Sequence, residues 1–242
     1  MAGGLVLWDF DGTLAWRAGM WSGAVMEVLD EHESGHGIVI ERIREGLRSG
    51  YPWDSWHEPH PQLCEPGRWW ELVQQRIALS LERAGIAAAR AAELAGSVRE
   101  RYLDVTIAWQ RFDDTLPALS ALREAGWRNV VLSNHVPELA DLVAGLGLAE
   151  HLDDVFSSAS TGYEKPHPEA FRLALAACGN PRQAWMVGDN PHADIEGAEA
   201  VGLPAILVRS AGSARRRAAG LEGAVAMIAG GGADAAAAPA TP

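Results

Sequence analysis

The sequence is poor in cysteine, in positive charge and in long apolar runs, and each shortage excludes a class of protein. Two cysteines among 242 residues exclude a disulfide framework and favour free thiols in a reducing compartment. Twenty lysines and arginines against 32 aspartates and glutamates give a net charge of −12. This argues against nucleic acid or an anionic membrane as the main partner.

No stretch approaches the roughly 18 uncharged apolar residues that span a bilayer. The apolar run at residues 5–8 is too short for the core of a secretory signal. We therefore expect a cytoplasmic protein that binds neither nucleic acid nor a membrane. The sequence does not indicate an oligomeric state.

What the chain does have is a composition that can bury a core, with 48% hydrophobic and 21% charged residues. Short unbroken apolar runs are typical of strands buried on both faces of a parallel sheet. Four such runs occur, with a weaker fifth at Val155–Ser157: Leu5–Trp8, Val130–Leu132, Ala184–Val187 and Ala205–Val208. Segments with helical periodicity lie between them, at 116–125, 137–146, 168–177 and 193–201. This alternation predicts an α/β fold with a Rossmann-like parallel sheet core.

Residues 17–109 interrupt the alternation. Apolar residues at helical spacing predict helices around Trp21–Leu29 and Trp70–Leu81, with a third from Arg90 to Leu103. We expect a Rossmann-like catalytic core at 1–16 and 110–229, an inserted α-helical cap domain at 17–109, and a flexible tail at 230–242. Arg215–Arg217 is interpreted as the solvated start of a helix.

Polar side chains follow the predicted strands where each strand ends. In an open α/β sheet the carboxyl ends of the strands form the ligand-binding edge. The residues that fall there are Asp9, Asp11, Gly12, Ser133, Asn134, Lys165, Asp189 and Asp194. The competing interpretation is structural: aspartates before glycine form turns, Ser133–Asn134 caps a helix, and Asp194 stabilises a helix start.

This set of side chains suits one chemistry. Carboxylates held close together need a hard cation among them, and oxygen ligands of this kind suit Mg²⁺. A carboxylate can attack phosphorus, and a second carboxyl group can protonate the leaving oxygen. A lysine and a hydroxyl group can hold the phosphoryl oxygens. The residues alone therefore predict metal-assisted phosphoryl transfer through an aspartyl-phosphate.

The same residues resemble the four motifs of the haloacid dehalogenase-like hydrolase superfamily, in the family's order and across residues 5–208. The matching segments are Asp9-Phe10-Asp11-Gly12-Thr13-Leu14, Ser133-Asn134, Lys165-Pro166 and Gly188-Asp189 through Asp194. The resemblance implies that Asp9 is the nucleophile, that Asp11 is the general acid and base, and that Lys165 bridges Asp9 and the phosphate.

It also implies a binding site for Mg²⁺ and phosphate. Asp9, the backbone carbonyl of Asp11 and Asp189 would hold the metal, and Asp194 would support it. Phosphate would be bound by Ser133, Asn134, Lys165 and Gly12.

Asp11 bears on the reaction type. Members of the family that cleave carbon–halogen bonds lack an aspartate at this position, because a departing halide needs no proton. Its presence favours hydrolysis of a phosphate monoester of a small phosphorylated metabolite. Two alternatives remain: a phosphomutase acting on a sugar phosphate, and a non-catalytic binding protein on the same fold.

Seven of the ten tryptophans lie within residues 16–109, which resembles a helical cap that closes over the site and selects the substrate. Around the proline-rich loop, aromatic faces could stack on a planar or sugar-containing phosphate and a basic side chain could hold a second anion. The alternative is that a small helical domain needs large side chains for its core. The candidates for specificity are Trp53, Trp56, His57 and Arg68. His135, which follows Ser133-Asn134, is expected to line the mouth of the site.

Overall fold

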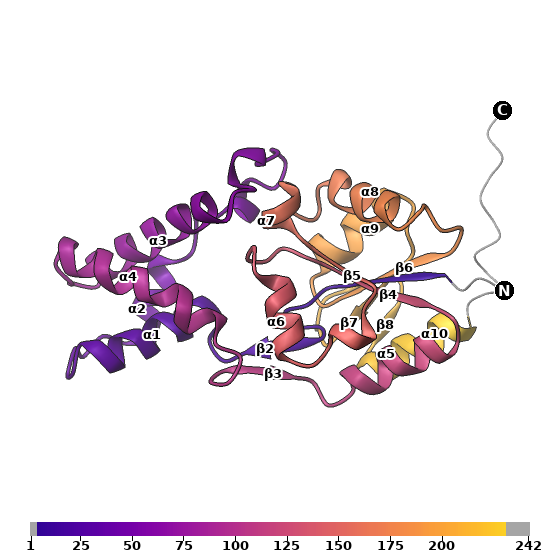
Figure 1. The fold of residues 1–242 in the computed structure, drawn as a ribbon, viewed down its shortest axis with the longest axis horizontal. Helices are drawn as coiled ribbons and strands as arrows, with labels where there is room; N and C mark the ends of the chain where they lie inside the picture. Colours follow the sequence, from indigo (N-terminus) through magenta and orange to yellow (C-terminus); the bar gives the residue numbers. More distant parts are fainter. Residues whose placement is uncertain (1–3, 231–242) are drawn as a thin grey trace.

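The computed structural model describes residues 4–230, and its centre is a six-stranded, fully parallel sheet (Figure 1). The strand order is β5-β4-β1-β6-β7-β8. The strands are β1 (Leu5–Trp8), β4 (Arg128–Ser133), β5 (Asp154–Ser157), β6 (Ala184–Gly188), β7 (Ala205–Val208) and β8 (Arg217–Ala218). The predicted α/β class is confirmed, and the first strand of the chain lies between β4 and β6 at the middle of the sheet.

Strand β1 shows why the apolar runs fold as they do. Val6 and Trp8 face one hydrophobic core, while Leu5 and Leu7 face the other, and all four are fully buried. Helices α5 (Thr115–Glu124), α6 (Leu139–Gly145) and α10 (Leu221–Gly230) contribute to the first core. Helices α8 (Pro168–Ala177) and α9 (Gly197–Ala200) contribute to the second. Figure 1 accordingly shows α5 and α10 on one side of the sheet and α8 and α9 on the other.

Residues 20–103, which lie between β1 and β4 in the chain, form a helical segment. It holds α1 (Met20–His32), α2 (Ile40–Gly46), the 3₁₀ turns η1 (Pro52–Ser55) and η2 (Pro61–Leu63), α3 (Pro66–Arg83) and α4 (Ala88–Leu103). Helices α1, α3 and α4 match the predicted ones, whereas α2, which is only seven residues long, was not predicted. These helices lie to one side of the sheet in Figure 1.

The two connections to this helical segment form a small antiparallel ribbon that the sequence did not predict. Strands β2 (Ala15–Arg17) and β3 (Trp109–Arg111) pair, with Ala15 opposite Arg111 and Arg17 opposite Trp109. A three-residue pairing leaves no recognisable hydrophobic run. The division into core, cap and tail remains a prediction, and residues 231–242 of the predicted tail lie outside the described residues.

Two local expectations need correction. The segment predicted as a helix at 193–201 is helical, but it begins with a π-helical turn, η4 (Pro191–Glu196), which continues into α9. Arg215–Arg217 does not start a helix: Arg217 begins β8, which pairs with β7, and α10 begins only at Leu221. The local structure at these arginines is therefore determined by backbone pairing at the edge of the sheet and not by the pattern of charges.

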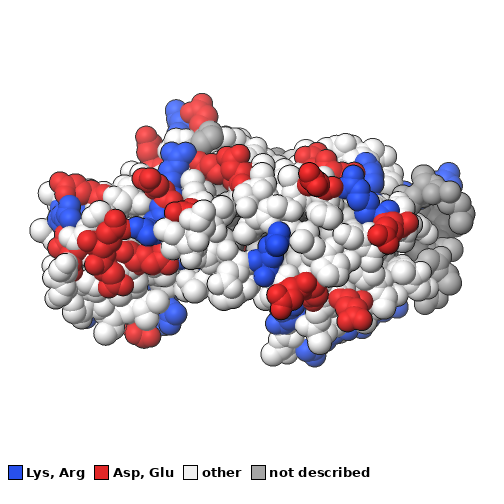
Figure 2. All heavy atoms as spheres, turned by 60° about the horizontal axis from the view of Figure 1, so that its bottom comes forward, with Lys and Arg blue, Asp and Glu red and all other residues white. Residues whose placement is uncertain are grey.

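The remaining short helices are η3 (Ala149–His151) and α7 (Ser158–Thr161). None of the helices within residues 4–230 combines the length and apolar character required to cross a bilayer. On the face seen in Figure 2, blue basic side chains lie among red acidic ones rather than in a broad patch of their own.

Candidate active site

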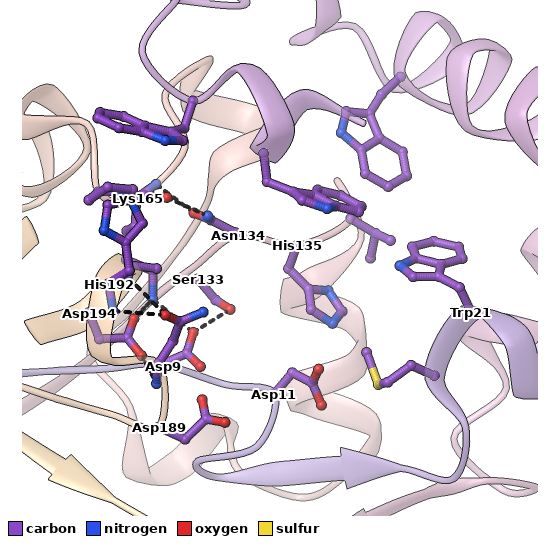
Figure 3. A pocket seen from close by; sticks show the side chains of 18 of the residues that line it. Asp9, Asp11, Trp21, Ser133, Asn134, His135, Lys165, Asp189, His192 and Asp194 are labelled. Atoms are coloured by element: carbon purple, nitrogen blue, oxygen red, sulfur yellow. Dashed lines mark hydrogen bonds and ion pairs between the residues drawn. The ribbon is translucent and has the colours of Figure 1, made fainter. Parts of the chain in front are cut away.

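The polar residues predicted to meet at the sheet edge do meet there. They line a pocket of about 440 Å³ between the carboxyl ends of the strands and the helical segment (Figure 3). The predicted core residues in its lining are Asp9, Asp11, Ser133, Asn134, His135, Lys165, Asp189 and Asp194. Parallel pairing of β1 with β4 and β6 brings residues more than a hundred positions apart to one place.

Asp9, directly after β1, is held by one side chain from the end of β4 and by one from the loop that follows α7. The Ser133 hydroxyl and the Lys165 ammonium each donate a hydrogen bond of 2.8 Å to the same oxygen, Oδ1 of Asp9. Asp9 is 7% exposed. A buried carboxylate that is fixed through one oxygen is well placed to act as a nucleophile.

Lys165 joins Asp9 to Asp194. Its Nζ donates to Oδ1 of Asp194 at 2.6 Å, and the other Asp194 oxygen accepts from the amide of Asn190 at 2.9 Å. Burial acts to lower the pKa of Lys165, but the charges of Asp194 and Asp9 outweigh it and raise that pKa. Because both Asp194 oxygens already have partners, this residue supports the site through Lys165.

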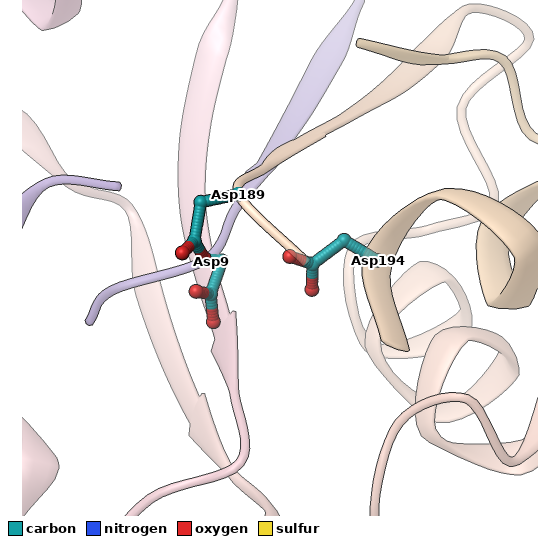
Figure 4. A group of neighbouring side chains, drawn as sticks. All are labelled: Asp9, Asp189 and Asp194. Atoms are coloured by element: carbon teal, nitrogen blue, oxygen red, sulfur yellow. The ribbon is translucent and has the colours of Figure 1, made fainter. Parts of the chain in front are cut away.

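Three carboxylates, from Asp9, Asp189 and Asp194, have oxygens within 4.8 Å of one another (Figure 4). Burial, together with the charges of Asp9 and Asp194, raises the pKa of Asp189. Lys165 supplies one positive charge for these three carboxylates, and the repulsion that remains favours a further cation among them. The donor set is made of oxygens alone, which fits a hard divalent metal ion.

Asp11 stands apart from this cluster. Figure 3 shows its carboxyl group pointing away from Asp9 and Asp189, toward the part of the pocket where His135 and Trp21 lie. Burial and the charges of Asp9 and Asp189 raise the pKa of Asp11 to about 8. A carboxyl group that keeps its proton near neutral pH can serve as a proton donor.

Gly12 is required by the approach of Asp189. Its φ is +79°, and a Cβ built there would lie 2.7 Å from Cγ of Asp189 and closer still to one carboxylate oxygen. Its amide donates to the carbonyl of Ala15 at 2.8 Å. The structure thus gives Gly12 a steric role, and its predicted role in phosphate binding remains a prediction.

Asn134 positions the lysine. Its side-chain amide donates to the carbonyl of Lys165 at 2.8 Å, and its oxygen accepts from the Lys165 amide at 2.7 Å. This pair of bonds ties the end of β4 to the loop that carries the ammonium group. The contact was not predicted, because it depends on two loops 31 residues apart.

His135 lines the pocket but lies deeper than the predicted mouth, since it is only 4% exposed. Its Nε2 lies 3.5 Å from the hydroxyl of Tyr102, while its Nδ1 has no partner among the described residues. Burial lowers the pKa of His135 to about 4, which makes the imidazole neutral at physiological pH.

The predicted specificity residues separate into two pairs. Trp53 and Trp56 line the pocket, whereas His57 and Arg68 do not. His57 faces Glu58, with 3.8 Å between Nε2 and Oε1, and Arg68 bonds to Glu65 at 3.1 Å; both side chains are largely exposed. A second anion-binding role for Arg68 therefore has no support from its position.

The lining also holds residues that were not predicted, among them Met20, Trp21, Trp69, Tyr102 and His192. Trp21 was predicted only as an apolar position of a helix; it stacks on Tyr102 with ring centroids 3.9 Å apart and also lines the cavity. His192 follows the same strand end as Asp189, so the argument that found Asp189 could have found it.

Comparison with known proteins agrees with this geometry. The family profile described as "haloacid dehalogenase-like hydrolase" matches residues 4–202. A mouse (Mus musculus) protein named haloacid dehalogenase-like hydrolase domain-containing protein 3 is 32% identical over 179 residues, 72% of this chain and 70% of its own. A phosphoserine phosphatase from Thermus thermophilus is 38% identical over 131 residues, about half of each chain.

Among solved structures, a 2-haloacid dehalogenase from Pseudomonas syringae is similar in fold, with a TM-score of 0.66 and 26% sequence identity. The similarity covers 93% of this chain and 97% of that one. The family profile extends from β1 through α9 and so includes every strand end that contributes to the pocket. The chain therefore belongs to the haloacid dehalogenase-like hydrolase family.

Proposed function

We propose that this chain is a Mg²⁺-dependent phosphatase that hydrolyses small phosphate monoesters through an aspartyl-phosphate on Asp9. The observation that carries the proposal is the pairing of Asp9, whose Oδ1 is held by Ser133 and Lys165, with Asp11 two residues later. In this proposal Asp9 is the nucleophile, bonded to Ser133 and Lys165, and Asp11 is the proton donor, whose carboxyl group points away from that cluster. The phosphatase named among the relatives supports the same reaction class.

The acidic cluster supports a metal. Asp9 and Asp189 would hold Mg²⁺, with the backbone carbonyl of Asp11 as a further oxygen ligand and Asp194 behind Lys165. When bound, the ion offsets the negative charge of the carboxylates and of the phosphate and polarises the phosphoryl group. Gly12 leaves the space that the Asp189 carboxylate occupies.

The protein's own groups perform the remaining steps. A carboxylate oxygen of Asp9 attacks phosphorus, the bond from phosphorus to the ester oxygen breaks, and the departing oxygen takes the proton of Asp11. Lys165 and Ser133 bind the phosphoryl oxygens as charge develops on them. Asp11, now ionised, removes a proton from water, which attacks the phosphoryl group and releases phosphate and free Asp9.

The helical segment acts in this proposal as a cap. Its residues Trp53 and Trp56 face the strand ends across the pocket, and the ring of Trp56 meets that of His192 with centroids 5.5 Å apart. A cap that closes over the strand ends excludes water and contacts the organic part of the substrate.

The alternative functions would require different catalytic groups or lead to different products. Removal of a halide requires no proton donor, so the placement of Asp11 speaks for phosphate ester hydrolysis. A phosphomutase would use the same groups but return the phosphoryl group to its sugar phosphate. A binding protein on this fold would have no need for a buried nucleophile and a separate acid.

The test is turnover of p-nitrophenyl phosphate and release of inorganic phosphate, with Mg²⁺ and with excess chelator. Asp9→Asn should lower kcat by about 10⁴-fold or more, since loss of a nucleophile removes the covalent route. Asp141→Asn, at an exposed position outside the pocket lining, is the matched control. Full activity of Asp9→Asn, or full activity in chelator, contradicts the proposal, and phosphoryl transfer between sugar positions would favour the mutase.

A further inference from the structure

We propose, on the basis of the phosphatase activity above, that the substrate's alcohol is aromatic or apolar and carries no second anionic group. Phosphate monoesters that bear a carboxylate or another phosphate would be disfavoured. Two independent features of the pocket support this: the aromatic wall opposite the carboxylates, and the shortage of cations in the lining.

The aromatic wall, defined as Trp21, Trp53, Trp56, Trp69 and Tyr102, comes entirely from the helical segment. Its rings are backed by other rings. Trp21 stacks on Tyr102 at 3.9 Å with 5° between the planes, and Tyr51 stacks on Trp53 at 4.6 Å with 4° between them. Rigid aromatic surfaces of this kind contact flat or apolar groups at small entropic cost.

Trp21, one member of this wall, lies on the side of the pocket that the alcohol must occupy. In Figure 3 the Asp11 carboxyl group is directed toward the side of the pocket that holds Trp21 and His135. Since Asp11 protonates the departing oxygen, the alcohol extends from Asp11 into this part of the cavity. Its partners there are ring faces and a neutral imidazole, which offer little to an anion.

The lining has one strong cation for four carboxyl groups. Lys165, the only lysine in the sequence, is already bonded to Asp9 and Asp194. Among the described residues that line the pocket there is no arginine. A second anion on the substrate would therefore lose water without gaining a charged partner.

The nearby arginines are occupied elsewhere. Arg17 lies buried with its guanidinium 5.7 Å from the Tyr102 ring, but it is bonded to Glu27 at 2.6 Å. Arg99 pairs with Glu138 and lies over the ring of Trp70. Recruiting Arg17 to the cavity would break this ion pair, in which the Arg17 side chain is fully buried and that of Glu27 is 30% exposed.

The experiment compares substrates that differ by a single carboxylate. Phenyl phosphate is paired with 4-carboxyphenyl phosphate, and phosphoethanolamine with phosphoserine, all assayed with Mg²⁺ at pH 7. We expect kcat/KM to favour the member without the carboxylate by about 10-fold or more in each pair. Phosphoserine is thus expected to be a poor substrate, in contrast to the name of the Thermus relative.

Two variants test the two features separately. His192→Arg places a cation at the pocket rim, where the histidine side chain is largely exposed and pairs with Glu196. In this variant the ratio of kcat/KM for the substrate without the carboxylate to kcat/KM for the one with it should fall about 5-fold or more, because the new cation attracts the carboxylate. Trp56→Leu should raise KM for phenyl phosphate about 10-fold relative to Trp127→Leu, a half-buried tryptophan outside the lining.

The outcomes separate the inference from the function on which it rests. If the esters are hydrolysed but the carboxylated member of each pair is used equally well or better, the inference fails and the phosphatase proposal stands. An unchanged preference in His192→Arg, or equal KM values in Trp56→Leu and Trp127→Leu, also counts against the inference. If none of the phosphate esters is hydrolysed, the phosphatase proposal fails and the inference falls with it.

Discussion

Replacement of Gly12 by alanine tests the contact that holds Asp189 in the acidic cluster. The new Cβ would lie 2.7 Å from Cγ of Asp189, whereas carbon atoms in contact stay about 3.5–4.0 Å apart, so the carboxylate must move by about 1 Å. Metal ligands keep their distances within about 0.2 Å. A misplacement of about 1 Å in a catalytic site costs on the order of 10²-fold in rate.

Gly126→Ala is the matched control, because Gly126 also has a positive φ, +85°, but no atom lies within 4 Å of its built Cβ. Both variants carry the same backbone strain, about 1–2 kcal/mol. We expect similar losses in thermal stability, but Mg²⁺ affinity by titration calorimetry and phosphatase turnover should fall about 10-fold or more in Gly12→Ala alone. If Gly12→Ala binds Mg²⁺ and turns over like Gly126→Ala, the steric argument for Gly12 is wrong.

Three further predictions concern the charged groups. Asp11→Asn should lower kcat/KM about 10²–10⁴-fold for an alkyl phosphate but much less for p-nitrophenyl phosphate, whose departing oxygen needs little protonation; an equal loss would argue against Asp11 as the acid. Lys165→Met should lower the free energy of unfolding by about 3–5 kcal/mol, because Asp9 and Asp194 lose their buried partner. Urea denaturation in chelator measures this loss, and a variant as stable as the wild type would contradict the prediction. In chelator, Asp11 binds its proton up to about pH 8 in the folded protein but only up to about pH 4 when unfolded, so stability should fall as pH rises through that window. The melting temperature in chelator should therefore be lower at pH 8 than at pH 5. A higher melting temperature at pH 8 would refute the prediction.

The sheet was predictable because its signals are local. A run such as Leu5–Trp8 must be buried on both faces, and this requirement fixes both the strand and the helices that cover it. The ribbon of β2 and β3 depends instead on pairing between segments more than ninety residues apart, and neither segment has a distinctive pattern. Strand β8 likewise exists because β7 offers a free edge, which the charges of Arg215–Arg217 do not indicate.

The candidate site divides in the same way. Residues at strand ends, such as Asp9, Ser133 and Asp189, could be predicted, because the topology alone brings strand ends to one edge. The cap residues could not, since helical periodicity shows that Trp21 is partly buried but not that its other side faces a cavity. His57 and Arg68 were selected by composition, and the structure pairs them with neighbouring glutamates.

The sheet edge and the helical segment contribute different kinds of side chain to the pocket. In the proposed mechanism the sheet edge uses a single lysine, which is already bonded to Asp9 and Asp194, and the described residues that line the pocket include no arginine. We therefore expect the substrate to be selected by the helical segment, whose contribution to the pocket is aromatic and apolar. An aromatic wall distinguishes substrates by shape and by desolvation, and it disfavours charge that it cannot neutralise. Under these proposals the two halves of the pocket impose opposite requirements on one molecule: a phosphate at one end, and an alcohol without a second anion at the other.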